Sequence, residues 1–329
     1  MLKAATLADL PAFSCAHTQD ESRGTGCTVI VAPSGATCGV AVRGGGPATR
    51  ETDLLKPENM VEKVHAVVLS GGSAFGLEAS CGVMEALAEQ GIGFELAGAH
   101  VPIVTGACLF DLLVGQNAHP DAAMGKAAAQ TALAQQPGAR LAEGNVGAGT
   151  GASVGKLLGA DYAMKSGFGT AGMRWGGLVC VALVAVNALG HVFDASGTQL
   201  AGTRDGHGGI LDPLDAFVRA AASEETHQTS SAPVTNTTIG CILTNARITK
   251  AQATKTASCA HDAYARAIKP VHTLNDGDTI FAYASGEIAA DPDAVSILAT
   301  EAMQHAVIRA VTQAESAYGL PSAKEYNTR

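Results

Sequence analysis

Residues 233–244 read Pro-Val-Thr-Asn-Thr-Thr-Ile-Gly-Cys-Ile-Leu-Thr, and this stretch joins a loop to a strand. The segment before it, 221–232, is short, polar and rich in Ser, Thr and Glu, which predicts a flexible, exposed connection. From Thr237 to Thr244 the β-branched and apolar side chains are typical of a buried strand. A hydroxyl side chain therefore stands where an exposed segment becomes a buried strand.

Two interpretations of Thr237 are open. In the plainer one it is only the first residue of a strand. In the other, the chain is cut between Asn236 and Thr237, so that one residue carries both a hydroxyl and a new α-amino group. Such an amine can take the hydroxyl proton, and its pKa of about 7.7–8.0 leaves a useful fraction neutral near pH 7. This chemistry needs no distant histidine.

Composition limits the classes of protein to which the chain can belong. Its 329 residues are 47% hydrophobic and 16% charged and include 39 Gly, which predicts a compact α/β protein with many tight turns. The net charge of −9 and the lack of basic clusters argue against nucleic acid and anionic membranes as partners. No long apolar helix and no leader pattern is evident, so we expect a soluble, cytoplasmic protein.

The eight cysteines do not form a metal or disulfide pattern. None falls in a Cys-x-x-Cys pair, and most lie in apolar or small-residue runs. Reduced, buried thiols are therefore expected rather than a disulfide framework or a zinc site.

Periodicity and turn residues predict alternating strands and helices. We expect a hairpin over Cys27–Val42 that turns at Pro33-Ser34-Gly35, then strands at His65–Leu69, Lys165–Gly172, Leu178–Asn187 and Thr279–Tyr283. Helices are expected at Leu77–Gln90, Ala122–Gln135, Pro213–Ala222, from a capping box at Thr249 to Lys269, and at Ala294–Ala314. The only composition break, near 221–236, is interpreted as a processing site, so residues 1–329 are predicted to form a single domain.

Two glycine-rich segments interrupt this pattern. Residues 70–76 read Ser-Gly-Gly-Ser-Ala-Phe-Gly between a predicted strand and helix, and residues 144–151 read Gly-Asn-Val-Gly-Ala-Gly-Thr-Gly. A strand, glycine loop and helix can bind phosphate. The spacing is not Gly-x-Gly-x-x-Gly, and no Gly-Lys-Ser/Thr follows the first segment. Glycines that permit close contact between helix and strand are therefore the favoured interpretation.

Four polar residues in small or apolar surroundings are also ambiguous. Lys156 either reaches solvent or is a retained functional charge. Asn187 either forms a turn at its strand end or donates its amide to a developing oxyanion. Asp276 and Asp278 either belong to a tight acidic turn or act in catalysis.

Several segments together resemble one enzyme family. Residues 70–77, 101–104 (Val-Pro-Ile-Val), 144–151 and 236–240 (Asn-Thr-Thr-Ile-Gly) are similar, in the same order, to the P1 (S58) peptidases. The resemblance spans nearly the whole chain. That family holds L-aminopeptidase/D-esterases, β-peptidyl aminopeptidases and 6-aminohexanoate-oligomer (nylon oligomer) hydrolases.

The resemblance implies a fold and a maturation step. The fold would be a four-layer αββα sandwich of the self-cleaving N-terminal-nucleophile type. The precursor would cut itself into an α chain, 1–236, and a β chain, 237–329, which stay together. It further implies homo-oligomers of αβ units, small peptide or amide substrates, and no metal or organic cofactor.

The resemblance also assigns site residues. Thr237 would be the nucleophile, and the bond from Asn236 to Thr237 the one that is cut. Asn187 matches the family's oxyanion-side asparagine, and Lys156, Asp276 and Asp278 look like the lysine and two aspartates of the nylon-oligomer hydrolase branch. The aminopeptidase branch has a serine at the position of Asp276 and a tyrosine near Lys156.

In the implied mechanism, Thr237 attacks an amide or ester to form an acyl-enzyme that water hydrolyses, with its α-amine as base and then acid. Asp276, close to Asp278 in the sequence, would orient the ammonium and hydroxyl of Thr237. Lys156 would keep the amine's pKa low by like-charge repulsion and would balance the aspartates. Two alternatives stay open. One is an acyltransferase of the glutamate N-acetyltransferase kind, and the other is a non-catalytic relative that binds small amides and remains uncut.

Overall fold

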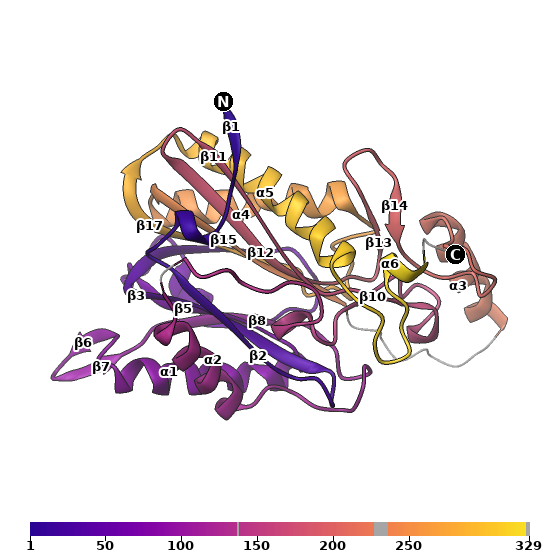
Figure 1. Cartoon of the computed structure of the whole chain (residues 1–329), viewed down its shortest axis with the longest axis horizontal. Coiled ribbons are helices and arrows are strands. Elements are labelled where there is room, and N and C mark those ends of the chain that lie inside the picture. Colours follow the sequence, from indigo (N-terminus) through magenta and orange to yellow (C-terminus); the bar gives the residue numbers. More distant parts are fainter. Residues whose placement is uncertain (137, 227–235, 327–329) are drawn as a thin grey trace.

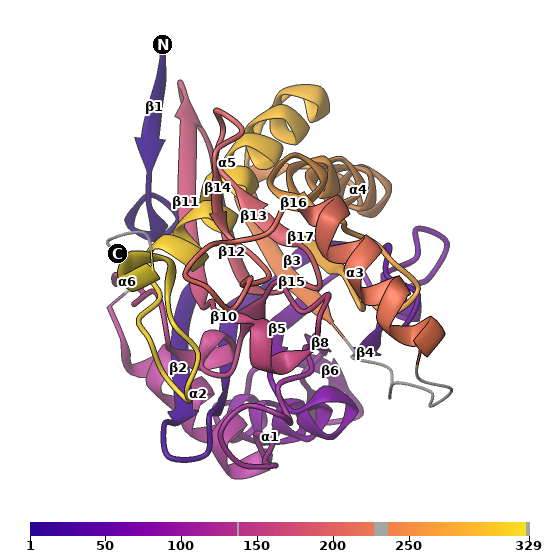
Figure 2. The same ribbon diagram turned by 90° about the vertical axis from the view of Figure 1, so that its right-hand side faces the viewer.

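The computed structural model describes residues 1–136, 138–226 and 236–326. Within them, strands and helices stack in four layers (Figures 1 and 2). The main sheet path runs β1-β11-β12-β15-β17-β3-β5-β8-β4, and β2 pairs with β3 outside that path.

The strands of the first part of the chain are β1 (Leu2–Ala5), β2 (Ser14–Asp20), β3 (Thr25–Val42), β4 (Ala48–Arg50), β5 (Val64–Ser70), β6 (Phe94–Leu96), β7 (Ala99–Val101), β8 (Val104–Cys108), β9 (Ser153–Val154) and β10 (Met164–Lys165). Those that follow are β11 (Phe168–Trp175), β12 (Leu178–Asn187), β13 (His191–Phe193), β14 (Gln199–Ala201), β15 (Thr237–Arg247), β16 (Ile268–Lys269) and β17 (Thr279–Ala289).

The α-helices are α1 (Ala79–Glu89), α2 (Ala122–Ala134), α3 (Pro213–Thr226), α4 (Lys250–Ala267), α5 (Pro292–Thr312) and α6 (Ala323–Tyr326). Short 3-10 turns lie at η1 (Leu7–Asp9), η2 (Asp53–Leu55), η3 (Ser73–Glu78), η4 (Gly147–Gly149) and η5 (Ala160–Tyr162).

Strand β3 connects the two inner layers. Its residues 25–31 pair with β2 and β5, whereas residues 37–42 pair with β17. The predicted hairpin over Cys27–Val42 is therefore wrong, because the chain continues as one strand of 18 residues through Pro33 and Gly35. The register shifts between Val31 and Ala36, so these turn-forming residues mark an irregularity at which the strand leaves one sheet for the other.

Three apolar clusters separate the four layers. One packs β12 and β15 against α4 and α5 and includes Ile242 and Ala257. A second lies between the two sheets and includes Leu243 and Leu69. The third packs the other sheet against α1 and α2 and includes Val68. Ile242 and Leu243 enter different clusters because successive side chains of a strand point to opposite faces. The expected αββα order is confirmed.

Most expected elements are present. Strand β12 has the predicted bounds, Leu178–Asn187, and all ten of its residues are buried. Helix α4 begins at the predicted capping box, in which Thr249 and Gln252 each accept from the other's backbone N–H. All eight cysteines are free thiols, most of them buried.

The predicted flexible connection, 221–232, is helical through Thr226, and its remaining residues lie outside the described part of the chain. Among the described residues, no helix combines the length and apolarity needed to span a membrane.

Candidate active site

Thr237 and Asn187 face each other across two neighbouring strands. Thr237 begins β15, Asn187 ends β12, and the two are direct partners in the antiparallel register. Directly opposed residues of an antiparallel pair place their side chains on the same face of the sheet. Both residues are buried. The sheet therefore brings together two predicted site residues that lie 50 positions apart in the sequence.

The peptide bond before Thr237 is held by the loop that leads into β17. The Thr237 hydroxyl donates to the carbonyl oxygen of Asn236, and the backbone N–H of Gly277 donates to the same oxygen at 2.8 Å. Asn236 forms a parallel bridge with Asp276. A Cβ atom at Gly277 would stand 2.8 Å from Thr237 Oγ1, so only glycine lets this loop approach so closely.

Lys156 lies beside Asn187. Its Nζ donates to the Asn187 backbone oxygen at 3.0 Å and to Asn187 Oδ1 at 2.8 Å. Burial lowers the pKa of Lys156 to about 7, against the opposing effect of the Asp276 and Asp111 carboxylates. Of the two interpretations of this lysine, the structure therefore favours a retained interior group over one that reaches solvent.

The side-chain amide of Asn187 has partners on both of its atoms. Its Oδ1 accepts from Lys156 Nζ and from the Ser153 N–H at 3.1 Å, and its Nδ2 donates to the Phe110 carbonyl at 2.8 Å. One amide hydrogen is thus used within the protein, and the second is the one that an oxyanion role would need. In this geometry Asn187 is above all the group that holds Lys156.

Asp278 holds the backbone next to the threonine. Its Oδ1 accepts from the Thr238 N–H at 2.7 Å, while its Oδ2 accepts from His272 Nδ1 at 2.7 Å and from the His272 backbone N–H at 3.2 Å. Sequence reasoning missed His272. The available signal was a histidine six residues before Asp278 in the same short loop.

Asp276 is held by the backbone of its own loop and by the Gly44-Gly45-Gly46 run. Its Oδ2 accepts from the Thr273 N–H at 2.6 Å, and its carbonyl accepts from the Gly46 N–H at 2.8 Å. Burial, with the nearby Asp278 carboxylate as a smaller cause, raises the pKa of Asp276. A Cβ atom at Gly44 would stand 2.2 Å from the Asp276 carbonyl oxygen. The Gly44-Gly45-Gly46 run is therefore a close contact with this loop.

The structure thus gathers all the predicted site residues at one end of β12 and β15. In addition, residues 6–324 match the model of peptidase family S58. The chain belongs to this family.

Curated relatives agree with this membership. An uncharacterized aminopeptidase of Mycobacterium leprae is 39% identical over 322 residues, which covers 90% of this chain and 85% of the relative. A 6-aminohexanoate-oligomer endohydrolase of Agromyces sp. is 32% identical, with 92% of this chain and 84% of the relative covered. As a member of family S58 with such relatives, the chain is a hydrolase that acts on amide bonds.

Solved structures agree on the fold. A β-aminopeptidase of Burkholderia sp. superposes with a TM-score of 0.67 at 20% identity, covering 98% of this chain and 92% of the other. An L-aminopeptidase D-Ala-esterase/amidase of Ochrobactrum anthropi gives a TM-score of 0.66 at 17% identity, covering 98% and 91%. The latter is described as a variant of the Ntn-hydrolase fold. The expected fold class of this S58 chain is therefore confirmed.

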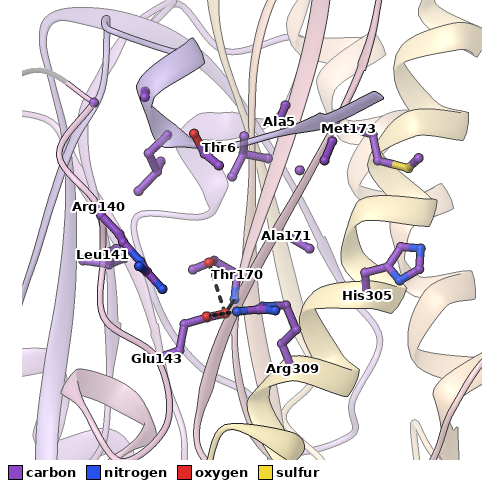
Figure 3. A pocket seen from close by; sticks show the side chains of 16 residues that line it. Ala5, Thr6, Arg140, Leu141, Glu143, Thr170, Ala171, Met173, His305 and Arg309 are labelled. Carbon is purple, nitrogen blue, oxygen red and sulfur yellow. Dashed lines mark hydrogen bonds and ion pairs between the residues drawn. The ribbon is translucent and has the colours of Figure 1, made fainter. Parts of the chain in front are cut away.

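A cavity of about 690 Å³ lies elsewhere in this S58 chain (Figure 3). It is bordered by β1, η1, β11 and α5, and in it Glu143 accepts from Thr170 and pairs with Arg309. Thr237, Asn187 and Lys156 do not line it, and neither do the two aspartates. The candidate active site is instead a buried cluster of polar groups.

Proposed function

We propose that this chain cuts itself between Asn236 and Thr237, and that the freed threonine then hydrolyses small peptides or related amides. The observation that carries the proposal is the contact between the Thr237 hydroxyl and the Asn236 carbonyl oxygen, on which the Gly277 N–H also converges. A nucleophile and a hydrogen-bond donor for the developing negative charge thus flank one peptide bond.

In the first stage Thr237 Oγ1 bonds to the Asn236 carbonyl carbon, and the hydroxyl proton passes to a base. The Gly277 N–H stabilises the negative oxygen. The C–N bond then breaks, the Thr237 nitrogen takes up a proton, and an ester joins Asn236 to the threonine oxygen. Water hydrolyses this ester, leaving a carboxylate on Asn236 and a free amine on Thr237.

The uncut chain has no α-amine at Thr237, so another group must accept that first proton. Lys156 is a candidate for this base, since its Nζ is hydrogen-bonded to Asn187, the residue directly opposite Thr237. Because burial lowers its pKa to about 7, a large fraction of this lysine is a neutral amine near pH 7.

In the second stage the α-amine of Thr237 takes the hydroxyl proton while Oγ1 attacks the substrate carbonyl. The leaving amine receives that proton as the substrate C–N bond breaks, and water hydrolyses the remaining ester. Asn187 is the register partner of Thr237, and its second amide hydrogen would bind the oxyanion. Asp278 would keep Thr237 oriented through its bond to the Thr238 N–H. Asp276, bridged to Asn236, would lie beside the new ammonium group.

The two fragments would remain one unit after the cut. Strand β15 pairs with β12 on one side and with β17 on the other, so fragment 237–329 supplies the centre of a sheet that fragment 1–236 surrounds. We therefore expect both fragments to copurify. Homo-oligomers of such units and a cytoplasmic location belong to the same proposal.

The substrate would be a short linear amide, as the names of the aminopeptidase and oligomer-endohydrolase relatives suggest. The informative panel consists of L- and D-amino-acid p-nitroanilides, β-dipeptides and aminohexanoate dimers. Adding ornithine as an acyl acceptor separates hydrolysis from the acyltransferase alternative, because an acyltransferase would yield acyl-ornithine in place of free acid.

Mass spectrometry of the purified chain tests the self-cut. We expect the wild-type chain to give two fragments that meet between Asn236 and Thr237, and Thr237→Ala to remain intact. The conservative control Thr237→Ser should give both fragments at a changed rate, because serine keeps the hydroxyl. Cleavage of the Thr237→Ala chain at the same bond would rule out the mechanism. So would a wild-type chain that hydrolyses the panel while it remains intact.

A further inference from the structure

The two glycine-rich segments of the sequence have no part in the mechanism above, yet they converge on one buried pair of charged residues. The pair consists of Asp111, which follows β8, and Lys165, which ends β10, and these residues are 2% and 0% exposed. Charged side chains buried this deeply are rare unless the fold supplies partners for them.

Asp111 lies between the two glycine segments. Its Oδ2 accepts from the Thr25 hydroxyl at 2.8 Å, and its Oδ1 accepts from the Gly72 N–H at 2.6 Å. A Cβ atom at Gly71 would stand 2.2 Å from Asp111 Oδ2, and one at Gly151 would stand 2.6 Å from Asp111 Cβ. Glycine at 71 and 151 therefore makes room for this carboxylate.

Lys165 binds the other end of the second glycine segment. Its Nζ donates to the carbonyl oxygens of Gly149 at 3.1 Å and Ala152 at 3.0 Å, and also to that of Ser166. All three ammonium hydrogens thus have carbonyl partners, and the backbone from Gly149 to Ala152 is held around the amine.

Each charged residue anchors a peptide group that contacts Asn187. The peptide group between Ala152 and Ser153 accepts from Lys165 through its oxygen and donates to Asn187 Oδ1 through its N–H. The peptide group between Phe110 and Asp111 accepts from Asn187 Nδ2. Asn187 Oδ1 and Nδ2 are therefore hydrogen-bonded to two different peptide groups, the first held by Lys165 and the second belonging to Asp111.

We propose that Asp111 and Lys165 are positioning residues that fix the orientation of the Asn187 amide and, through its Oδ1, the amine of Lys156. This inference rests on the proposed function, because it concerns the geometry of that same site. It assigns the two glycine segments the task of enclosing the pair.

The cost of burying Asp111 and Lys165 argues that they serve a role other than stabilising the fold. Burial lowers the pKa of Lys165 to about 7 and raises that of Asp111 to about 6, so both ionised forms are costly in this place. Well-packed apolar side chains of similar volume commonly give as much stability as buried charged groups, or more. A fixed Asn187 is a reason to retain the pair that stability alone does not supply.

The test compares Lys165→Met with the control Lys250→Met. Lys250 is also buried, and its Nζ donates to the carbonyls of Leu54 at 3.0 Å and Asn59 at 2.7 Å, but it lies at the start of α4, which follows the far end of β15. Both variants lose a buried amine that holds a loop. Only Lys165→Met is expected to lower kcat, about 10- to 100-fold with KM little changed.

A double-mutant cycle separates positioning from general damage. If Lys165 acts through Asn187, Lys165→Met adds little to the loss of activity that Asn187→Ala already causes. A crystal structure of Lys165→Met should show Asn187 Oδ1 turned away from Lys156 Nζ. If the folded yield of Lys165→Met is too low, Asp111→Asn replaces it in the double-mutant cycle and in the crystal structure. This variant should fold, since its amide oxygen can still accept from the Gly72 N–H.

Additive losses, an unmoved Asn187 amide, or an equal loss of kcat in Lys250→Met would each overturn the inference. These outcomes are all measured against an active wild-type chain. A wild type that neither cuts itself nor hydrolyses an amide would instead refute the proposed function, so the two failures can be told apart.

Discussion

At the scale of single residues, His272 shows how the site holds its charges in place. Two donors from this residue, the ring Nδ1–H and the backbone N–H, bind Asp278 Oδ2, and the other carboxylate oxygen binds the Thr238 N–H. His272 has a left-handed backbone, with φ of 58°, which turns its own N–H toward the carboxylate. His272 thus holds the carboxylate that binds the backbone next to Thr237.

We expect His272→Ala to lower kcat about tenfold or more with KM little changed. The reason is that a hydrogen bond to a charged group contributes about 1.5–3 kcal/mol, and its loss lets Asp278 move. Steady-state kinetics on the best panel substrate measures the effect. His100→Ala, on an exposed strand, is the control, and full activity of His272→Ala would contradict this role.

At the scale of elements, helices α1 and α2 meet backbone to backbone. A Cβ atom at Gly82 would stand 1.7 Å from the Ala122 carbonyl oxygen, and one at Gly125 would stand 1.9 Å from that of Ala79. No side chain fits at these two positions, so the glycines set the distance between the helices. The pair covers the outer face of the sheet that contains β5 and β8 (Figure 1).

Gly125→Ala should therefore reduce the free energy of unfolding by about 1–3 kcal/mol, because the added methyl group must push α1 away. The higher helix propensity of alanine, about 1 kcal/mol, offsets only part of this loss. Urea titration followed by circular dichroism measures the change. Gly177→Ala is the matched control, since its Cβ atom would meet nothing closer than 3.9 Å, and equal stabilities of the two variants would refute the account.

At the scale of the whole molecule, three histidines are withdrawn from solvent in separate places, His191 and His261 fully and His17 in part. Burial lowers the pKa values of His17, His191 and His261 to about 4. Each is therefore neutral in the folded chain at a pH where it is protonated in the unfolded chain, whose histidines titrate near pH 6.5. Between about pH 6.5 and 4 the unfolded state binds more protons, so acidification favours unfolding over that window.

We predict that the midpoint of thermal unfolding falls as the pH is lowered from 6.5 to 4. Asp111 and Asp276 oppose this trend, because burial raises their pKa values, that of Asp111 to about 6, and they gain a proton earlier in the folded state. They face four imidazoles, since burial also lowers the pKa of His65. Calorimetry on the Thr237→Ala chain, which is expected to remain in one piece, gives the midpoints.

Replacing one histidine tests the cause. His261→Gln should flatten the acid dependence, since glutamine does not titrate and can still donate to the Ala41 carbonyl that His261 Nε2 contacts at 2.9 Å. An unchanged slope in this variant would show that other groups produce the acid lability.

Short sequence patterns predicted the secondary structure correctly where the residues of one element are enough to determine it. The apolar run of β12 and the capping box of α4 gave the correct type and the correct starting residue. The hairpin predicted around Pro33 and Gly35 failed because turn-forming residues mark a break in regular pairing without saying whether the chain reverses. Here β17 pairs with the second half of β3, and this non-local contact keeps the chain extended instead of letting it reverse.

The candidate site divides in the same way. Thr237, Asn187, Lys156, Asp276 and Asp278 could be chosen from motifs and from resemblance to a family, and the fold brings them together. Asp111 and Lys165 could not be chosen so, because their partners lie on distant segments of the chain. His272 was overlooked although its partner Asp278 lies only six residues away in the same loop.

From the sequence alone, resemblance to family S58 implied the four layers, and one segment marked the residue at which a cut would expose a nucleophile. The second of these has a local cause, since a hydroxyl at a strand start is visible within that one segment. Only the tertiary structure decided which oxygen the Thr237 hydroxyl meets and how Asn187 and Lys156 are held. Those contacts join backbone groups from distant loops, and hydrogen bonds between such groups depend on the packing of the whole chain.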